Sequence, residues 1–178
     1  RLSGRNNNAV IISFDSEGNQ GTSTSFLANY NGMLKVEGKL LLYGVKRDAQ
    51  NIYRATVEVT DGNGGVLQTV QSEIGDDFSW LTALIPSENG FVGYGSTYSG
   101  TGNIELSNSF IVFYDHELNE ISHKILKYSP GNSHIINTAT LGKRHFISEL
   151  DNGNFVVFFQ GELKVLDSTG EELKSISL

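Results

Sequence analysis

The chain carries one short motif four times at nearly even spacing. In each copy an apolar strand ends in an aspartate, and a tight polar turn leads into a second strand; the aspartates are Asp15, Asp61, Asp115 and Asp167. They lie 46, 54 and 52 residues apart, and Leu118 in the Asp115 copy replaces the glycine that ends the other three turns. Aspartate accepts backbone N–H groups at the start of a turn, and glycine adopts the positive φ required at its end. The repeat therefore predicts a series of similar β-hairpins.

Strand signals fill the sequence between these turns, whereas helical periodicity is hard to find. The best helical window, 163–178, fits two strands around a turn equally well. Short segments rich in β-branched and aromatic residues are bounded by Gly, Asn, Asp or Ser, which is typical of strands. They lie at 9–14, 40–43, 55–59, 91–94, 110–114, 155–159 and 163–166. We therefore expect an all-β fold.

A second recurring feature, a strand that ends in or near a glycine, precedes the aspartate motif. An apolar strand ends in or near a glycine at Gly4, Gly44 and Gly95, whereas the last unit has Phe159 and no glycine there. A further short strand and hairpin turn come before it, so each full unit holds four strands. Four-stranded antiparallel units that repeat every roughly 40–50 residues are the sequence signature of β-propeller blades.

The repeat divides the chain into a half blade and three blades. Their predicted boundaries are 1–26, 27–72, 73–127 and 128–178. We therefore expect a single, partial β-propeller of about three and a half four-stranded antiparallel blades. A propeller must close to remove its exposed sheet edges, so upstream sequence or a second chain is expected to complete the ring. An open sheet or a β-sandwich with hairpins at similar spacing is the alternative.

The 73–127 unit resembles the propeller repeats of exported and surface proteins from Bacteroidetes-type bacteria. The shared pattern is an aromatic opening at 78–80, the sequence Glu-Asn-Gly-Phe-Val-Gly-Tyr-Gly at 88–95, a Ser/Thr/Gly/Asn loop, and Phe-Ile-Val-Phe-Tyr-Asp at 110–115. The units before and after it match in part. The resemblance implies a β-propeller fold and an extracytoplasmic location, in the periplasm or at the cell surface.

Composition excludes several classes of partner and site. The 178 residues have a net charge of −7 and include no cysteine, so disulfides and thiolate metal sites are excluded. Nucleic acids and anionic membranes need clustered Lys and Arg, which the chain lacks, and no apolar stretch approaches the ~20 residues of a membrane-spanning helix. Because the chain starts at Arg1 without a signal-like apolar segment, we expect a mature or excised piece.

No residue pattern specifies a reaction or a cofactor. The histidines His116, His123, His134 and His145 contain no pair with His-x-x-x-His spacing, and Ser133 beside His134 does not by itself make a catalytic triad. The Asp-Gly-Asn-Gly sequence at 61–64 resembles part of a calcium-binding loop, but its residue types are also those expected of a tight turn, which accounts for them without a metal ion. We therefore expect a protein that is not an enzyme and binds no cofactor.

The long polar loops are the predicted binding surface. In a propeller, the loops between the second and third strands of each blade and the connections between blades share one face, and the longest here are 96–108 and 129–143. A loop tyrosine with polar neighbours can stack on a sugar or anchor a protein contact. Trp80 is expected in the core between blades. The candidate contact residues are Tyr98, Asn103, His134 and Arg144.

These features predict a non-catalytic β-propeller module for recognition or scaffolding in an exported or cell-surface bacterial protein. Its expected partners are another protein or the remaining blades of the same propeller. Two alternatives stay open. One is a carbohydrate-binding or carbohydrate-processing propeller, which needs aromatic and carboxylate side chains to converge on the loop face. The other is a self-contained β-sandwich adhesin domain.

Overall fold

The computed structural model describes residues 9–14, 16–26, 29–61, 64–75, 78–98, 108–126, 146–159 and 161–177, which form strands and turns and no helix. The strands are β1 (Ala9–Phe14), β2 (Gln20–Phe26), β3 (Asn29–Val36), β4 (Lys39–Arg47), β5 (Tyr53–Thr60), β6 (Val66–Ser72), β7 (Phe78–Ser87), β8 (Gly90–Tyr98), β9 (Asn108–Tyr114), β10 (Glu120–Leu126), β11 (Phe146–Glu149), β12 (Phe155–Phe159), β13 (Glu162–Leu166) and β14 (Glu172–Ser177). Every segment predicted as a strand lies within one of them, which confirms the all-β prediction.

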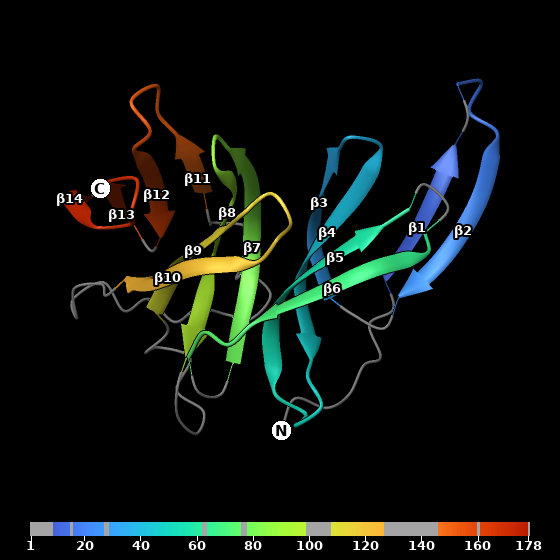
Figure 1. Ribbon diagram of the computed structural model, residues 1–178, viewed down its shortest axis with the longest axis horizontal. Coiled ribbons are helices and arrows are strands. Elements are labelled where there is room, and N and C mark those ends of the chain that lie inside the picture. The colour runs from blue at the N-terminus through green and yellow to red at the C-terminus, as the bar shows by residue number, and fades with distance from the viewer. Residues whose placement is uncertain are drawn as a thin grey trace.

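Neighbouring strands along the chain pair in antiparallel hairpins (Figure 1). The strands β3–β6 form a first four-stranded meander, β7–β10 form a second, and β11–β14 form a third. A single parallel pair, Tyr53 with Phe78, joins the first two meanders into one eight-stranded mixed sheet. The third meander is a separate four-stranded antiparallel sheet, and β1 and β2 form a two-stranded sheet.

The aspartate motif closes the hairpins as predicted. Asp115 Oδ1 accepts the backbone N–H groups of Glu117 at 3.0 Å and of Asn119 at 2.8 Å. Asp167 Oδ1 accepts the equivalent two N–H groups, and Asp61 Oδ1 accepts the one four residues on, from Gly65; Asp15 lies outside the described residues. The turns end at positive φ, with 85° at Gly64, 84° at Gly170 and 66° at Leu118. Leu118 therefore occupies a conformation that favours glycine.

The glycine that ends the strand before an aspartate motif lies at a β-bulge. In both β4 and β8 the glycine lies opposite a register shift in the preceding strand, near Tyr30 for Gly44 and near Leu81 for Gly95. A Cβ on Gly44 would overlap the carbonyl oxygen of Asn29, and one on Gly95 would overlap that of Trp80. In the third meander the equivalent position is Phe159, and the described pairing of β11 with β12 ends one residue before it, at Phe146 with Phe158. The glycine is therefore required where the bulge brings two backbones together.

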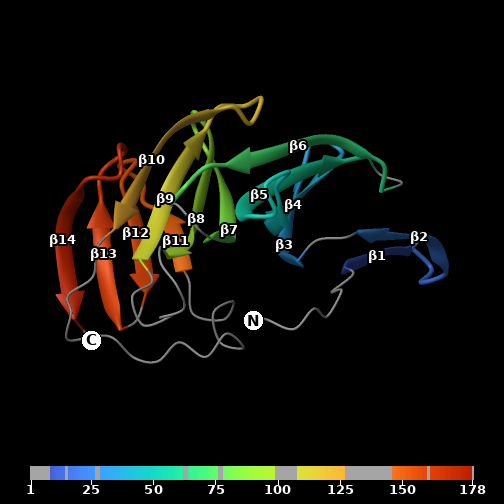
Figure 2. The ribbon, with the colours of Figure 1, turned by 90° about the horizontal axis from the view of Figure 1, so that it is seen from below.

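The three meanders pack face to face, with the second in the middle (Figure 2). Alternate side chains of β9 point to opposite neighbours, because successive residues of a strand face opposite sides. The core between the first and second meanders contains Leu41, Ala55, Val57, Val59, Leu81, Leu84, Phe110, Val112 and Tyr114. The core between the second and third contains Val92, Tyr94, Ile111, Leu126, Ile147, Phe155, Val157 and Leu166.

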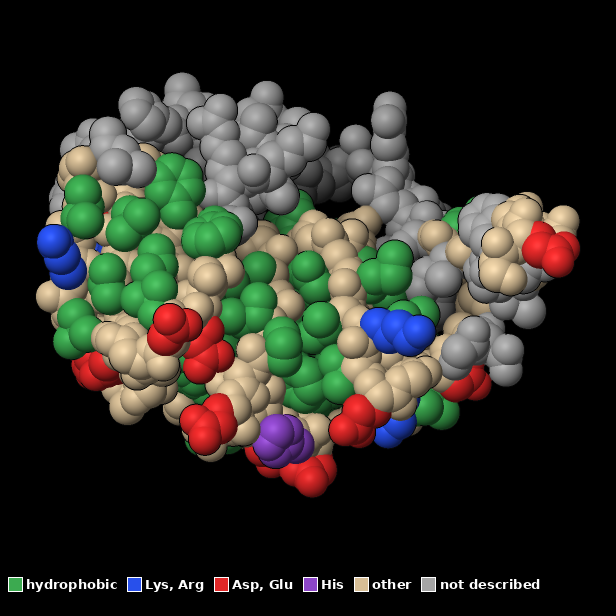
Figure 3. Space-filling view, turned by 90° about the horizontal axis from the view of Figure 1, so that it is seen from above, with side chains coloured by type: hydrophobic (Ala, Val, Ile, Leu, Met, Phe, Trp, Pro, Cys, Tyr) green, Lys and Arg blue, Asp and Glu red, His purple; other side chains and the backbone are tan. Residues whose placement is uncertain are grey.

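Hydrophobic side chains also gather on the outer surface of the third meander. Phe146 is 52% exposed and Ile176 is 38% exposed. Figure 3 shows a group of hydrophobic side chains on the left of the molecule, where this meander lies.

No helix of the described residues is long and apolar enough to cross a membrane.

Candidate functional site

The β4–β5 hairpin closes with the same aspartate turn as the repeat, but at the opposite end of the meander. Asp48 Oδ1 accepts the N–H groups of Gln50 at 2.9 Å and of Ile52 at 2.8 Å, and Asn51 has a φ of 66°. Asparagine tolerates this conformation better than most residues. Burial acts to raise the pKa of Asp48, but the hydrogen bonds from Ile52, Arg54 and Gln50 outweigh it and hold the pKa below its ordinary value. Asp48 is therefore ionised and positioned by the turn.

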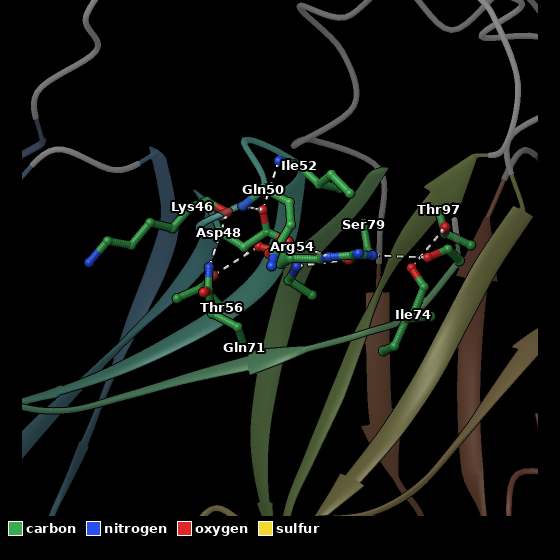
Figure 4. Close-up of polar contacts among 12 residues, drawn as sticks. Lys46, Asp48, Gln50, Ile52, Arg54, Thr56, Gln71, Ile74, Ser79 and Thr97 are labelled. Atoms are coloured by element: carbon green, nitrogen blue, oxygen red, sulfur yellow. Dashed lines mark hydrogen bonds and ion pairs between the residues drawn. The ribbon is translucent and has the colours of Figure 1, made fainter. Parts of the chain in front are cut away.

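Arg54 links this turn to the second meander (Figure 4). Its Nε lies 3.0 Å from Asp48 Oδ2, and its Nη1 donates to the carbonyl oxygen of Gly75 at 3.0 Å. Gly75 belongs to the connection between β6 and β7. Both charged side chains are largely buried, so removing either would leave the other without its partner. Arg54 therefore sets how the ends of the two meanders lie against each other.

Two buried hydroxyl groups strengthen the same junction. Ser79 Oγ accepts the backbone N–H of Ala55 at 2.8 Å, which joins β7 to β5. Thr97 Oγ1 lies 2.7 Å from the carbonyl oxygen of Phe78 and 3.2 Å from that of Ile74 (Figure 4). These bonds hold β5, β7 and β8 together at this end, so side chains carried here have fixed positions.

A row of aromatic rings crosses the junction. The Tyr53 and Phe78 rings lie 5.5 Å apart between centroids, and Phe78 and Trp80 lie 5.9 Å apart. The Arg47 guanidinium lies 4.5 Å from the centre of the Tyr53 ring and donates to the Tyr53 hydroxyl at 2.7 Å and to Asn51 Oδ1 at 2.6 Å. Rigid rings beside a positioned arginine are typical of recognition surfaces. We call Arg47, Tyr53, Phe78 and Trp80 the aromatic row.

Trp80 was predicted to lie in the core, and its side chain is half-buried. Its indole N–H is withdrawn from solvent and has no hydrogen-bond partner among the described residues. Buried Trp N–H groups usually find a partner. The Trp80 indole N–H is therefore a buried donor whose hydrogen-bonding capacity is unused in the described part of the chain.

The structure brings one predicted contact residue to this place. Tyr98 ends β8, and its backbone pairs with that of Phe78, although its side chain lies outside the described part. Asn103, His134 and Arg144 lie outside the described residues. Sequence reasoning missed Arg47 and Tyr53, which face each other across the β4–β5 hairpin. Their signal in the sequence is an arginine and a tyrosine on either side of Asp48 and Asn51, which are turn-forming residues.

A groove of about 570 Å³ lies at the opposite end of the strands, between the second and third meanders. Its lining combines apolar side chains, among them Phe113 and Phe155, with two carboxylates, Glu88 and Glu149. The β7–β8, β11–β12 and β13–β14 turns all contribute to it. Among the described residues, no group of three or more His, Asp or Glu side chains is placed to hold a metal ion.

No protein-family model matches this sequence, and no curated protein matches it.

Proposed function

We propose that the chain is a non-catalytic recognition or scaffolding module, built as a partial β-propeller with the aromatic row as its contact surface. The observation that carries the proposal is the face-to-face stack of three four-stranded meanders, with Arg47, Tyr53 and Phe78 held at one end. Propellers consist of such meanders arranged around an axis. The proposed location, outside the cytoplasm of a bacterium, rests on the resemblance of the 73–127 unit.

Recognition is favoured over catalysis by what surrounds the row. The Arg47 guanidinium is already held in place by Asn51 Oδ1 and by the Tyr53 hydroxyl. The two histidines in the described ranges lie on the β9–β10 hairpin, and His123 Nδ1 is 2.7 Å from a Glu120 carboxylate oxygen. Large rings held in place contribute contact area at low entropic cost, which suits a protein partner.

Site-specific photo-crosslinking in the source cells tests this function. A photoreactive phenylalanine analogue replaces the exposed Gln50, beside Arg47, or, as a control, the exposed Glu117 at the other end of the strands. We expect a discrete protein adduct from position 50 alone, and its loss in a Tyr53→Ala background. Identical adducts from both positions, or an adduct that survives Tyr53→Ala, would refute the role of the aromatic row.

A second candidate function is carbohydrate binding in the groove. The groove is lined by the apolar side chains of Phe113 and Phe155 and by the carboxylates of Glu88 and Glu149. This lining favours sugar binding, because sugar rings stack on aromatic faces and sugar hydroxyl groups donate hydrogen bonds to carboxylates. A glycan array probed with the chain and with Glu149→Gln separates the two functions. Glycan binding that is lost in Glu149→Gln and retained in Tyr53→Ala would favour the groove.

A further inference from the structure

The outer face of the third meander repeats a surface that is covered in the other two. Val59, Phe113 and Val165 each lie two residues before a turn aspartate. Their pairing partners on the preceding strand are Leu41, Val92 and Val156. Two residues further from the turn, the equivalent pairs are Val57 with Tyr43, Ile111 with Tyr94, and Leu163 with Phe158. All twelve of these residues are hydrophobic.

Burial differs between the three copies. Val57 and Ile111 are both 0% exposed, whereas Leu163 at the same position is half-buried. Val156, Phe158 and Val165 are half-buried too, and the strongly exposed Phe146 pairs with Phe158. We call Val156, Phe158, Leu163 and Val165 the outer face.

In the first and second meanders, the equivalent hydrophobic residues are covered by the next meander along the chain. Val57 and Leu41 pack in one cluster with Leu81, Phe110 and Val112 of the second meander. Val92 and Ile111 pack in another with Phe155 and Val157 of the third. The same four hydrophobic positions thus pack against a following four-stranded meander in two of the three meanders.

We infer that the outer face binds a further four-stranded antiparallel meander that presents an apolar face of its own. This inference rests on the proposed propeller and names the partner of its third described meander. The interface continues the two that exist within the chain, because hydrophobic residues occupy the equivalent strand positions and pair in the equivalent register. Sheets packed in this way lie about 10 Å apart, so the side chains of both faces interdigitate.

The first meander of a second copy of this chain offers a poorer match. On the side that faces away from the second meander, this first meander carries Thr56, Glu58 and Thr60, which are buried within the chain, where the second meander carries Phe110, Val112 and Tyr114. Glu58 is held there by Lys46, Tyr30 and Thr69. Because these three residues are polar and already buried, a hydrophobic face packed on this side would remove little further apolar area from water at these positions. The occupant is therefore a meander with apolar residues at these positions.

Thiol labelling tests the inference directly, because the chain has no cysteine. Leu163→Cys and Ile176→Cys place single thiols on the third meander, and Ile121→Cys on β10, at a residue 61% exposed, is the matched control. Each variant is made in the chain alone and in fusions that append a duplicate of residues 73–126 or of residues 146–177 after Leu178. We expect maleimide to modify the thiol of Leu163→Cys at least about tenfold more slowly in a fusion, with the control unchanged, because labelling then requires the added meander to open.

Equal reactivity of the Leu163→Cys and Ile176→Cys thiols in the chain alone and in both fusions would overturn the inference. Protection that grows with the concentration of the unfused chain would also overturn it, since a second copy would then cover the face. A Val112→Glu change in the appended 73–126 duplicate alone should restore the reactivity. The labelled thiols lie outside the aromatic row, so failure of this measurement would leave the crosslinking test of the recognition surface standing.

Discussion

Leu118 keeps a buried side chain in a backbone conformation that glycine adopts in the equivalent turns. Its φ is 66°, its N–H donates to the Asp115 carbonyl oxygen at 3.0 Å, and it is 4% exposed in the core between the first and second meanders. Gly64 and Gly170 occupy the same turn position with φ near this region. Two opposing contributions to the free energy of unfolding therefore meet at one residue.

Their magnitudes predict an unusual order for two substitutions. Removing the buried side chain costs about 2–5 kcal/mol in either Leu118→Ala or Leu118→Gly. A residue with a Cβ also pays roughly 1–2 kcal/mol in the left-handed region, and only glycine avoids that cost. After part of this gain is offset by the greater freedom of glycine in the unfolded chain, Leu118→Gly should be more stable than Leu118→Ala by about 1 kcal/mol.

Urea unfolding followed by circular dichroism measures the difference. Leu84 is the matched control because it is also 4% exposed and lies in the same core, but on the extended strand β7. There glycine should be less stable than alanine by roughly 0.5–1 kcal/mol. If Leu118→Gly proves as unstable as Leu118→Ala, or less stable, then the left-handed turn does not strain Leu118 and the reasoning fails.

Three further outcomes follow from the same contacts. Gly44→Ala and Gly95→Ala should each lower the free energy of unfolding by roughly 1–3 kcal/mol, because the new Cβ would overlap a carbonyl oxygen at the bulge; urea unfolding checks this. Tyr114→Phe should cost about 1–2 kcal/mol, because it removes the 2.7 Å hydrogen bond to the buried Ser72 hydroxyl, and adding Ser72→Ala should recover part of the loss. Burial acts to raise the pKa of Glu58, but hydrogen bonds from Lys46, Tyr30 and Thr69 outweigh it and lower the pKa below 4.5. Its stabilisation is therefore present above pH 4.5 and lost as the pH falls through the lower, folded-state pKa, so Glu58→Gln should reduce the acid dependence of the unfolding midpoint.

The candidate site was only partly predictable from the sequence. The polar loops predicted as the binding surface include the β4–β5 turn, and Tyr98 ends beside Phe78 as part of this end of the sheet. The aromatic row itself was missed, because Tyr53 and Phe78 meet through one parallel pair between two meanders. A contact between separate hairpins leaves no periodic signal in the sequence. The roles of Asn103, His134 and Arg144 stay predictions.

Local chemistry made the strands and turns readable from the sequence alone. The turn at Asp115 is closed by hydrogen bonds to residues no more than four positions away, so its pattern is complete within a short segment. The same holds at Asp167, and at Gly44 and Gly95 a missing side chain reports a bulge in the neighbouring strand. Hydrogen-bond geometry over such short distances depends little on the rest of the chain.

Only the tertiary structure decided which face of each strand meets which neighbour. The run from Phe110 to Tyr114 predicted a strand, but its composition did not show that Val112 faces the first meander and Ile111 the third. The hydrophobic effect is non-directional, so the sequence does not show which apolar face will cover a given strand. The choice of partner came from strand register, from bulges and from bonds such as that between Arg54 and Gly75, which act together only in the folded chain.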